Sequence, residues 1–349
     1  MVGIPWTLDI DWETVEKIDT YAANGVIAKK AGLLPSKRGF AMRVEMFFHR
    51  VLRVVIVLAG FMATAASAEE VQIRYAGKTL NANLEIADGK TLGDGVIVIV
   101  HALMQHYDTE IIRGLQERFS DAGRNSLAMT LSMGIDDRRG SFECTTPLRF
   151  LFQDAVDEGL AWLAWLKTQG AGPVVMLGHS LGANQALKLT VEHYDPQISA
   201  LVLLSPMTMG VERLRDAHKM RFREDLDKVT AQAKALIAQG RADQLMRADA
   251  ITCPQAEVAP ATLLDFYGGE PLNADPTTHL SRVTVPMFII AGSADERQPN
   301  AAAFLERYVD NRMVFLYTVE SAGHFFRDLN LDEAAEEAVA FLDRLDESQ

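Results

Sequence analysis

The sequence is poor in cysteine and in basic residues. Its 349 residues include only two cysteines, Cys144 and Cys253, and 34 lysines and arginines stand against 47 aspartates and glutamates, a formal net charge of −13. The two cysteines form no CxxC motif and no zinc-ligand spacing. Nucleic acid or an anionic lipid surface would call for a basic face, so the acidic balance argues against both as the main partner.

The sequence also lacks an apolar run long enough to cross a membrane. The run from Val54 to Ala63 is shorter than the roughly 18 apolar residues that a spanning helix needs. Basic residues from Arg43 to Arg53 precede it, and Ala66-Ser67-Ala68 follows, which is the order of a signal peptide with its cleavage site. We therefore predict a signal peptide at residues 42–68 and a periplasmic or secreted protein. An uncleaved single-span anchor is the alternative.

A signal that begins at residue 42 leaves an unusual segment in front of it. Export signals normally lie at the extreme N-terminus. We therefore expect residues 1–41 to be an upstream extension outside the native protein, or disordered, with translation starting at Met42 or Met46.

Export bears on the two cysteines, because thiols that meet in an oxidising compartment become a disulfide. A bridge between Cys144 and Cys253 would close a loop of about 100 residues and contribute on the order of 4 to 5 kcal/mol in the chain-entropy model. The sequence leaves two alternatives open, a bridge and two separate buried thiols.

The stretch from Val174 to Gly182 predicts a strand that delivers a serine into a tight turn. Four apolar residues lead into Gly178-His179-Ser180-Leu181-Gly182, and helix formers follow. Small residues on both sides of Ser180 suit a strained turn against which strand and helix pack closely. The GxSxG pattern alone is weak evidence of catalysis, so its context decides.

Strands and helices alternate over most of the chain. An opening hairpin and alternating elements predict a mostly parallel central sheet with helices on both faces. Between residues 207 and 279 the strand pattern stops, which indicates a helical cap insertion; the core is then 69–206 and 280–349. The predicted strands are 71–75, 79–86, 96–100, 126–131, 174–177, 199–204, 285–291 and 313–319.

Three residues with complementary chemistry each follow a predicted buried strand: Ser180, Asp295 and His324. Reactive groups of such sheets gather at the carboxyl ends of the strands. With the order Ser, Asp, His, the hairpin and the cap, residues 71 to 345 resemble the α/β-hydrolase family. The resemblance implies that Ser180 is the nucleophile, His324 the base and then the acid, and Asp295 the residue that orients the imidazole.

The resemblance also implies an oxyanion hole formed by the backbone amides of Leu103 and Leu181. Most relatives have His-Gly at this turn, whereas this chain has His101-Ala102. Glycine reaches unusual dihedral angles, so we expect alanine to shift the Leu103 amide. We expect His101 to brace the loop by hydrogen bonding.

The function that these observations favour is an exported, carboxylesterase-like serine hydrolase that works through an acyl-enzyme without metal or organic cofactor. Its partner would be a small ester or acyl compound, and it would meet a membrane only through an uncleaved signal segment. Met207, Met209, Phe266 and Tyr267 are candidates for the pocket wall, or belong to the core of the cap. The alternative function is a non-catalytic binding or envelope protein that keeps the fold.

Overall fold

The computed structural model describes residues 67–208, 210–269 and 272–347. The predicted upstream extension and signal peptide lie outside the described residues, apart from Ser67 and Ala68, which begin the first strand. In the part of the chain that the structure describes, no helix is sufficiently long and apolar to cross a membrane.

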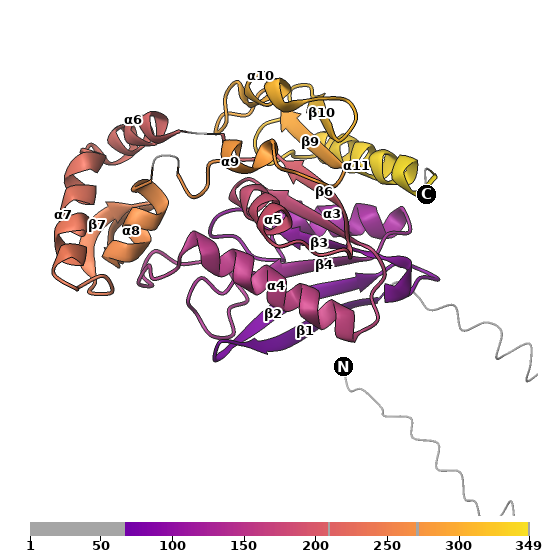
Figure 1. Cartoon of the computed structure of the whole chain (residues 1–349), viewed down its shortest axis with the longest axis horizontal. Coiled ribbons are helices and arrows are strands. Elements are labelled where there is room, and N and C mark those ends of the chain that lie inside the picture. Colours follow the sequence, from indigo (N-terminus) through magenta and orange to yellow (C-terminus); the bar gives the residue numbers. More distant parts are fainter. Residues whose placement is uncertain (1–66, 209, 270–271, 348–349) are drawn as a thin grey trace, which may run out of the picture. The chain divides into compact units, whose positions relative to one another are not determined.

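A central sheet organises the described residues (Figure 1). Its spatial order is β1-β2-β4-β3-β5-β6-β9-β10. The β1–β2 and β2–β4 pairs are antiparallel, and every pair from β4 to β10 is parallel. The strands are β1 Ser67–Tyr75, β2 Lys78–Ile86, β3 Val96–Val100, β4 Ser126–Thr130, β5 Val174–His179, β6 Ile198–Leu204, β9 Met287–Gly292 and β10 Val314–Val319.

The inner strands are mostly apolar because helices cover both faces of the sheet. Every residue of β3 is buried, and its side chains alternate between the two faces. Val96, Val98 and Val100 join a cluster with α4 and α5, while Ile97 and Ile99 join a cluster with α3 and α11. The helices of this core are α3 Glu110–Asp121, α4 Phe152–Thr168, α5 Leu181–Glu192, α10 Ala301–Leu305 and α11 Leu329–Glu347. The predicted fold is confirmed.

The segment between β6 and β9 contributes no strand to the central sheet in its described residues. Its first two helices are separate because Arg223 adopts a left-handed φ of 57° and ends the first. The expectation of helices alone was incomplete, since β7 and β8 pair as an antiparallel hairpin. The elements are α6 Val211–Phe222, α7 Leu226–Ala238, β7 Met246–Ala250, β8 Cys253–Val258, α8 Pro260–Tyr267 and α9 Thr277–Leu280.

Asn184 fixes both ends of this segment beside the serine turn. Its side-chain amide oxygen accepts from the Met207 N–H and its nitrogen donates to the Met207 carbonyl, both at 2.8 Å. The same nitrogen also donates to the Ala274 carbonyl. A buried side chain on the helix that follows Ser180 therefore holds the entry and the exit of the cap.

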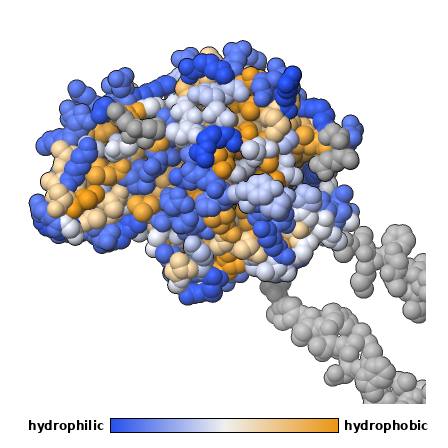
Figure 2. Space-filling view, viewed as in Figure 1, coloured by the Kyte–Doolittle hydropathy of each residue, from blue (hydrophilic) through white to orange (hydrophobic). Residues whose placement is uncertain are grey.

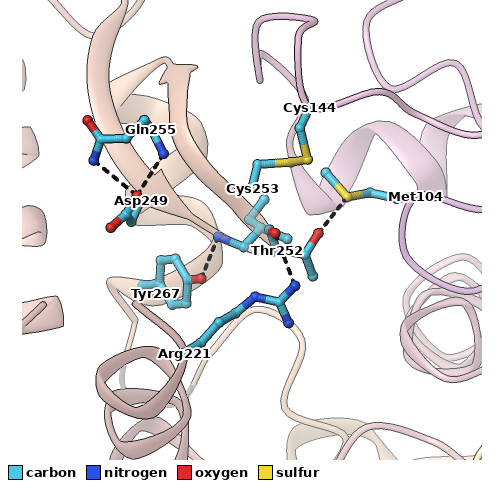
Figure 3. The surroundings of a disulfide bond; sticks show 9 residues. Met104, Cys144, Arg221, Asp249, Thr252, Cys253, Gln255 and Tyr267 are labelled. Carbon is cyan, nitrogen blue, oxygen red and sulfur yellow. Dashed lines mark hydrogen bonds between the residues drawn. A yellow bond between two sulfur atoms is a disulfide. The ribbon is translucent and has the colours of Figure 1, made fainter. Parts of the chain in front are cut away.

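Cys144 and Cys253 form a disulfide across 109 residues of sequence, which decides between the two alternatives that the sequence leaves open. Figure 3 shows that the bond joins the loop after β4 to the start of β8. The cap hairpin is thus covalently attached to the core.

The described surface carries few large apolar side chains. Those exposed are Tyr75, Tyr194, Met220 and Leu329, in different parts of the chain. On the face drawn in Figure 2, apolar residues are interrupted by polar ones. A concave site is therefore a better candidate for function than a flat apolar face.

Candidate active site

Ser180 stands at a strained turn between β5 and α5. Its φ of 56° and ψ of −122° are unusual for a residue with a side chain. A Cβ atom at Gly178 would lie 2.3 Å from the Gly182 carbonyl oxygen, and one at Gly182 would lie 2.4 Å from the His101 carbonyl oxygen. The turn is strained, as predicted, and only glycine fits at the positions two residues before and after Ser180.

The structure brings Ser180, His324 and Asp295 together. The Ser180 hydroxyl lies 2.9 Å from Nε2 of His324, and Nδ1 of His324 lies 2.8 Å from Oδ2 of Asp295. An ionised carboxylate only accepts hydrogen bonds, so Nδ1 carries the proton and Nε2 is free to accept from the serine. This tautomer is the one that a general base needs.

The turn after β9 holds the Asp295 carboxylate in place. Its Oδ1 accepts from the backbone N–H groups of Arg297 at 2.9 Å and Gln298 at 2.8 Å. Burial alone raises the pKa of Asp295, but the hydrogen bond and charge of His324 and the Gln298 amide outweigh it, so this pKa lies below its ordinary value. The carboxylate therefore stays ionised beside the imidazole.

His179 supports the backbone of His324. Its Nε2–H donates to the His324 carbonyl at 2.9 Å, and its Nδ1 has no partner among the described residues. Burial, with the nearby His324, lowers the pKa of His179 to about 3. A neutral, buried ring fits a structural role better than that of a second base.

The predicted oxyanion residues line the same pocket as Ser180. Within the described residues, neither the Leu103 nor the Leu181 backbone N–H has a hydrogen-bond acceptor. Ala102 does not have a left-handed φ, so the expected dihedral cause for a shifted Leu103 amide is absent. The residue of this turn with such an angle is Met104, with a φ of 63°. Alanine at 102 thus meets no dihedral penalty.

His101 braces this turn by hydrogen bonding, as expected. Arg138 also supports it, a role that the sequence does not reveal. His101 Nδ1–H donates to the Ala102 carbonyl at 2.7 Å, while its Nε2 accepts from the Leu131 N–H at 3.0 Å. Arg138 is buried and donates to the carbonyl of Gln105 at 2.9 Å. A single arginine in a polar loop gives no signal in sequence. Burial and the neighbouring Arg138 charge lower the pKa of His101 to about 3.

A pocket of about 340 Å³ opens over Ser180 and His324. The cap supplies much of its wall, including Ile251 and Thr252. Three of the four predicted wall residues line it, namely Met207, Phe266 and Tyr267; Met209 lies outside the described residues. Tyr267 is also cap core, since its hydroxyl accepts from the Ile251 N–H at 2.7 Å.

A sequence profile of the alpha/beta hydrolase family matches residues 97–341. The chain belongs to this family. The resemblance predicted from Ser180, Asp295 and His324 is thereby confirmed at the family level. No curated protein gives a significant match in sequence.

Solved structures of other alpha/beta hydrolases share the fold at low identity. Est1E from Butyrivibrio proteoclasticus is 17% identical with a TM-score of 0.55, over 80% of this hydrolase and 99% of Est1E. The Pyrococcus furiosus esterase PF2001 is 18% identical with a TM-score of 0.53, over 80% and 91% of the two chains. The esterase domain of a Rhodothermus marinus protein is 14% identical with a TM-score of 0.52, over 80% and 98%. At these identities the likeness concerns the fold.

Proposed function

We propose that this alpha/beta hydrolase cleaves a carboxylic ester through an acyl-enzyme formed on Ser180. The observation that carries the proposal is the continuous hydrogen-bonded series from Ser180 Oγ through His324 to Asp295, at 2.9 and 2.8 Å. Ser180 and His324 line a pocket that Leu103 and Leu181 also line. Esterases among the solved structures support the substrate class, and one of them, Est1E, has been solved with ferulic acid bound.

Each group has a chemical task. His324 Nε2 takes the Ser180 proton as the oxygen attacks the carbonyl carbon, and then returns that proton to the leaving alcohol. Asp295 stabilises the imidazolium that exists between those two transfers. Water then repeats the cycle on the acyl-enzyme and releases the acid. The Leu103 and Leu181 amides, which have no acceptor among the described residues, would donate to the developing oxyanion, where one donor is typically worth about 3 to 4 kcal/mol.

A fluorophosphonate probe tests the proposal directly, because it labels a serine only when a base activates it. We expect stoichiometric labelling of the wild type at Ser180 and none of Ser180→Ala, with circular dichroism showing that both are folded. Equal labelling of the two proteins, or no labelling of either, would favour a non-catalytic binding protein.

Export belongs to the same proposal. The basic, apolar and Ala66-Ser67-Ala68 segments support a cleaved signal, and the Cys144–Cys253 disulfide fits an oxidising compartment. N-terminal sequencing of the native protein should begin at Glu69. A peptide from residues 6–29 in the native protein would contradict the proposed start at Met42 or Met46.

A further inference from the structure

The direction of the Leu103 amide depends on the carbonyl of the residue before it. Ala102 C=O and Leu103 N–H belong to one planar trans peptide group, so they point in opposite directions. The Ala102 oxygen accepts from His101 Nδ1–H at 2.7 Å and from the Gln105 N–H at 3.1 Å. The second of these bonds closes a turn over residues 102–105, and that turn aims the Leu103 N–H.

This turn requires an unfavourable conformation at Met104. Its φ of 63° occurs at the third position of the turn, where glycine or asparagine is favoured. Such an angle is unfavourable for a residue with a side chain, which keeps it only when its surroundings impose it. If Met104 relaxed to negative φ, the turn would either lose the Gln105–Ala102 hydrogen bond or flip the 103–104 peptide group to the type I arrangement. Either change would disturb the turn that carries the Leu103 N–H.

Two segments from different parts of the chain hold Met104. The Phe142 N–H donates to the Met104 carbonyl at 3.0 Å. From the cap, the Thr252 hydroxyl donates to the Met104 sulfur at 3.0 Å (Figure 3). A thioether is a weak acceptor, so this second contact orients Met104 only if Thr252 is itself held in place.

The disulfide joins these two segments. Cys144 lies two residues after Phe142, and Cys253 directly follows Thr252. At the other end of β8, Leu148 donates to the Glu257 carbonyl at 2.8 Å and accepts from the Ala259 N–H at 2.9 Å. The hairpin therefore stays attached to the core without the disulfide, while its end at Thr252 depends on the disulfide.

We propose that the Cys144–Cys253 disulfide is a positioning element for the oxyanion turn, acting through Thr252 and Phe142 on Met104. This inference rests on the proposed function, since it assigns the Leu103 amide to the oxyanion. Its role goes beyond holding the cap on the core: without the bridge the triad stays intact, but the amide that stabilises the transition state loses its direction.

The test compares wild type with the double variant Cys144→Ser, Cys253→Ser on 4-nitrophenyl acetate, well below the melting temperature of each. We expect kcat to fall by about 10-fold or more while KM changes less than about twofold, because a misplaced donor weakens transition-state binding. A lower melting temperature with an unchanged kcat would overturn the proposal, since it would show a purely stabilising bond.

Variants at Thr252 keep the proposal testable if the double variant does not fold. With the disulfide present, Thr252→Val removes the hydroxyl at nearly constant volume and should lower kcat several-fold. Thr252→Ser retains the hydroxyl and should recover most of that loss. In the disulfide-free background Thr252→Val should have little additional effect. Wild-type kcat in Thr252→Val, or full additivity of the two changes, would contradict the proposed route.

Fluorophosphonate labelling separates failure of this inference from failure of the proposed function. If the wild type is not labelled at Ser180, the proposed function fails. If the wild type is labelled and hydrolyses esters while the disulfide-free variant is equally fast, only the positioning role fails.

Discussion

Asp295 has almost no access to solvent, so water screens its effect on His324 only weakly. Its side chain is 1% exposed, and that of His324 is 3% exposed. Two backbone amides fix one carboxylate oxygen and the imidazole binds the other. The carboxylate thus fixes the tautomer of His324 and lies beside the charge that forms during proton transfer.

Replacing this carboxylate by an amide should disable the base without unfolding the protein. We expect Asp295→Asn to lower kcat by roughly 10³- to 10⁴-fold, as in serine hydrolases where the corresponding change selects the wrong tautomer. The measurement is the rate on a 4-nitrophenyl ester together with the melting temperature. Asp88→Asn, in the exposed turn after β2, is the matched control. Wild-type rates in Asp295→Asn would mean that another acid orients His324.

Two buried histidines predict a loss of stability in acid. Burial holds the pKa of both His101 and His179 at about 3, below the value of about 6.5 that they have when unfolded. Between these values the unfolded chain binds more protons at these residues, so their contribution to the free energy of unfolding is largest above pH 6.5 and falls as the pH drops toward 3. Each histidine should contribute a slope of about 1.4 kcal/mol per pH unit.

Urea denaturation from pH 7 to pH 4.5 measures this slope. His179→Asn removes one titrating group and keeps an N–H donor near the His324 carbonyl. Its slope should be smaller than that of the wild type by about one histidine's share, 1.4 kcal/mol per pH unit. Equal slopes in the two proteins would show that His179 is protonated in the folded state.

At the scale of elements, α5 approaches β3 so closely that residue 182 must be a glycine. A Cβ at Gly182 would meet the carbonyl oxygens of Val100 and His101 at 2.4 Å. These are backbone atoms at the end of β3 and just after it, and they cannot move aside cheaply. The same approach places Ser180 beside the oxyanion turn that follows β3. Packing and chemistry therefore depend on one glycine.

Gly182→Ala should cost about 3 kcal/mol of unfolding free energy through overpacking. It should also lower kcat, because any relief of the clash moves His101 or Ser180. Gly140→Ala is the control, since a Cβ there would contact nothing within 4 Å, and it should stay within about 0.5 kcal/mol of wild type. A melting temperature for Gly182→Ala equal to that of Gly140→Ala would contradict this account.

The core and the triad could be predicted from the sequence because their signals are local. Continuous apolar runs such as Val96–Val100 mark covered strands, and Ser180, Asp295 and His324 each lie shortly after the end of a parallel strand of the central sheet. The β7–β8 hairpin was missed because β7 contains the charged residues Arg247 and Asp249 and β8 contains Pro254. Arg138 and Thr252 were missed because their roles depend on contacts with Gln105 and Met104, far away in sequence.

At the scale of the whole molecule, the pocket differs in charge from the chain around it. The chain has a net charge of −13, yet two arginines, Arg221 and Arg297, line the pocket. Among the described residues Arg221 pairs with no carboxylate and donates only to the Thr252 carbonyl, at 3.2 Å. Arg297 lies 3.9 Å from Glu296. A substrate with a distal negative charge would find an unpaired cation at the cap wall.

This charge pattern predicts that Arg221 discriminates between neutral and anionic esters. Arg221→Gln should raise KM for the mono-4-nitrophenyl ester of adipic acid by about 2- to 5-fold, the range of an exposed ion pair. It should leave KM for 4-nitrophenyl hexanoate, an uncharged ester of the same chain length, unchanged. Because exposed charges are screened, the difference should shrink as the salt concentration rises from 0.01 to 1 M, where the Debye length falls from about 30 to 3 Å. Equal changes in KM for both esters would mean that Arg221 shapes the cap wall through packing, since the loss of its stem would then affect both acyl chains alike.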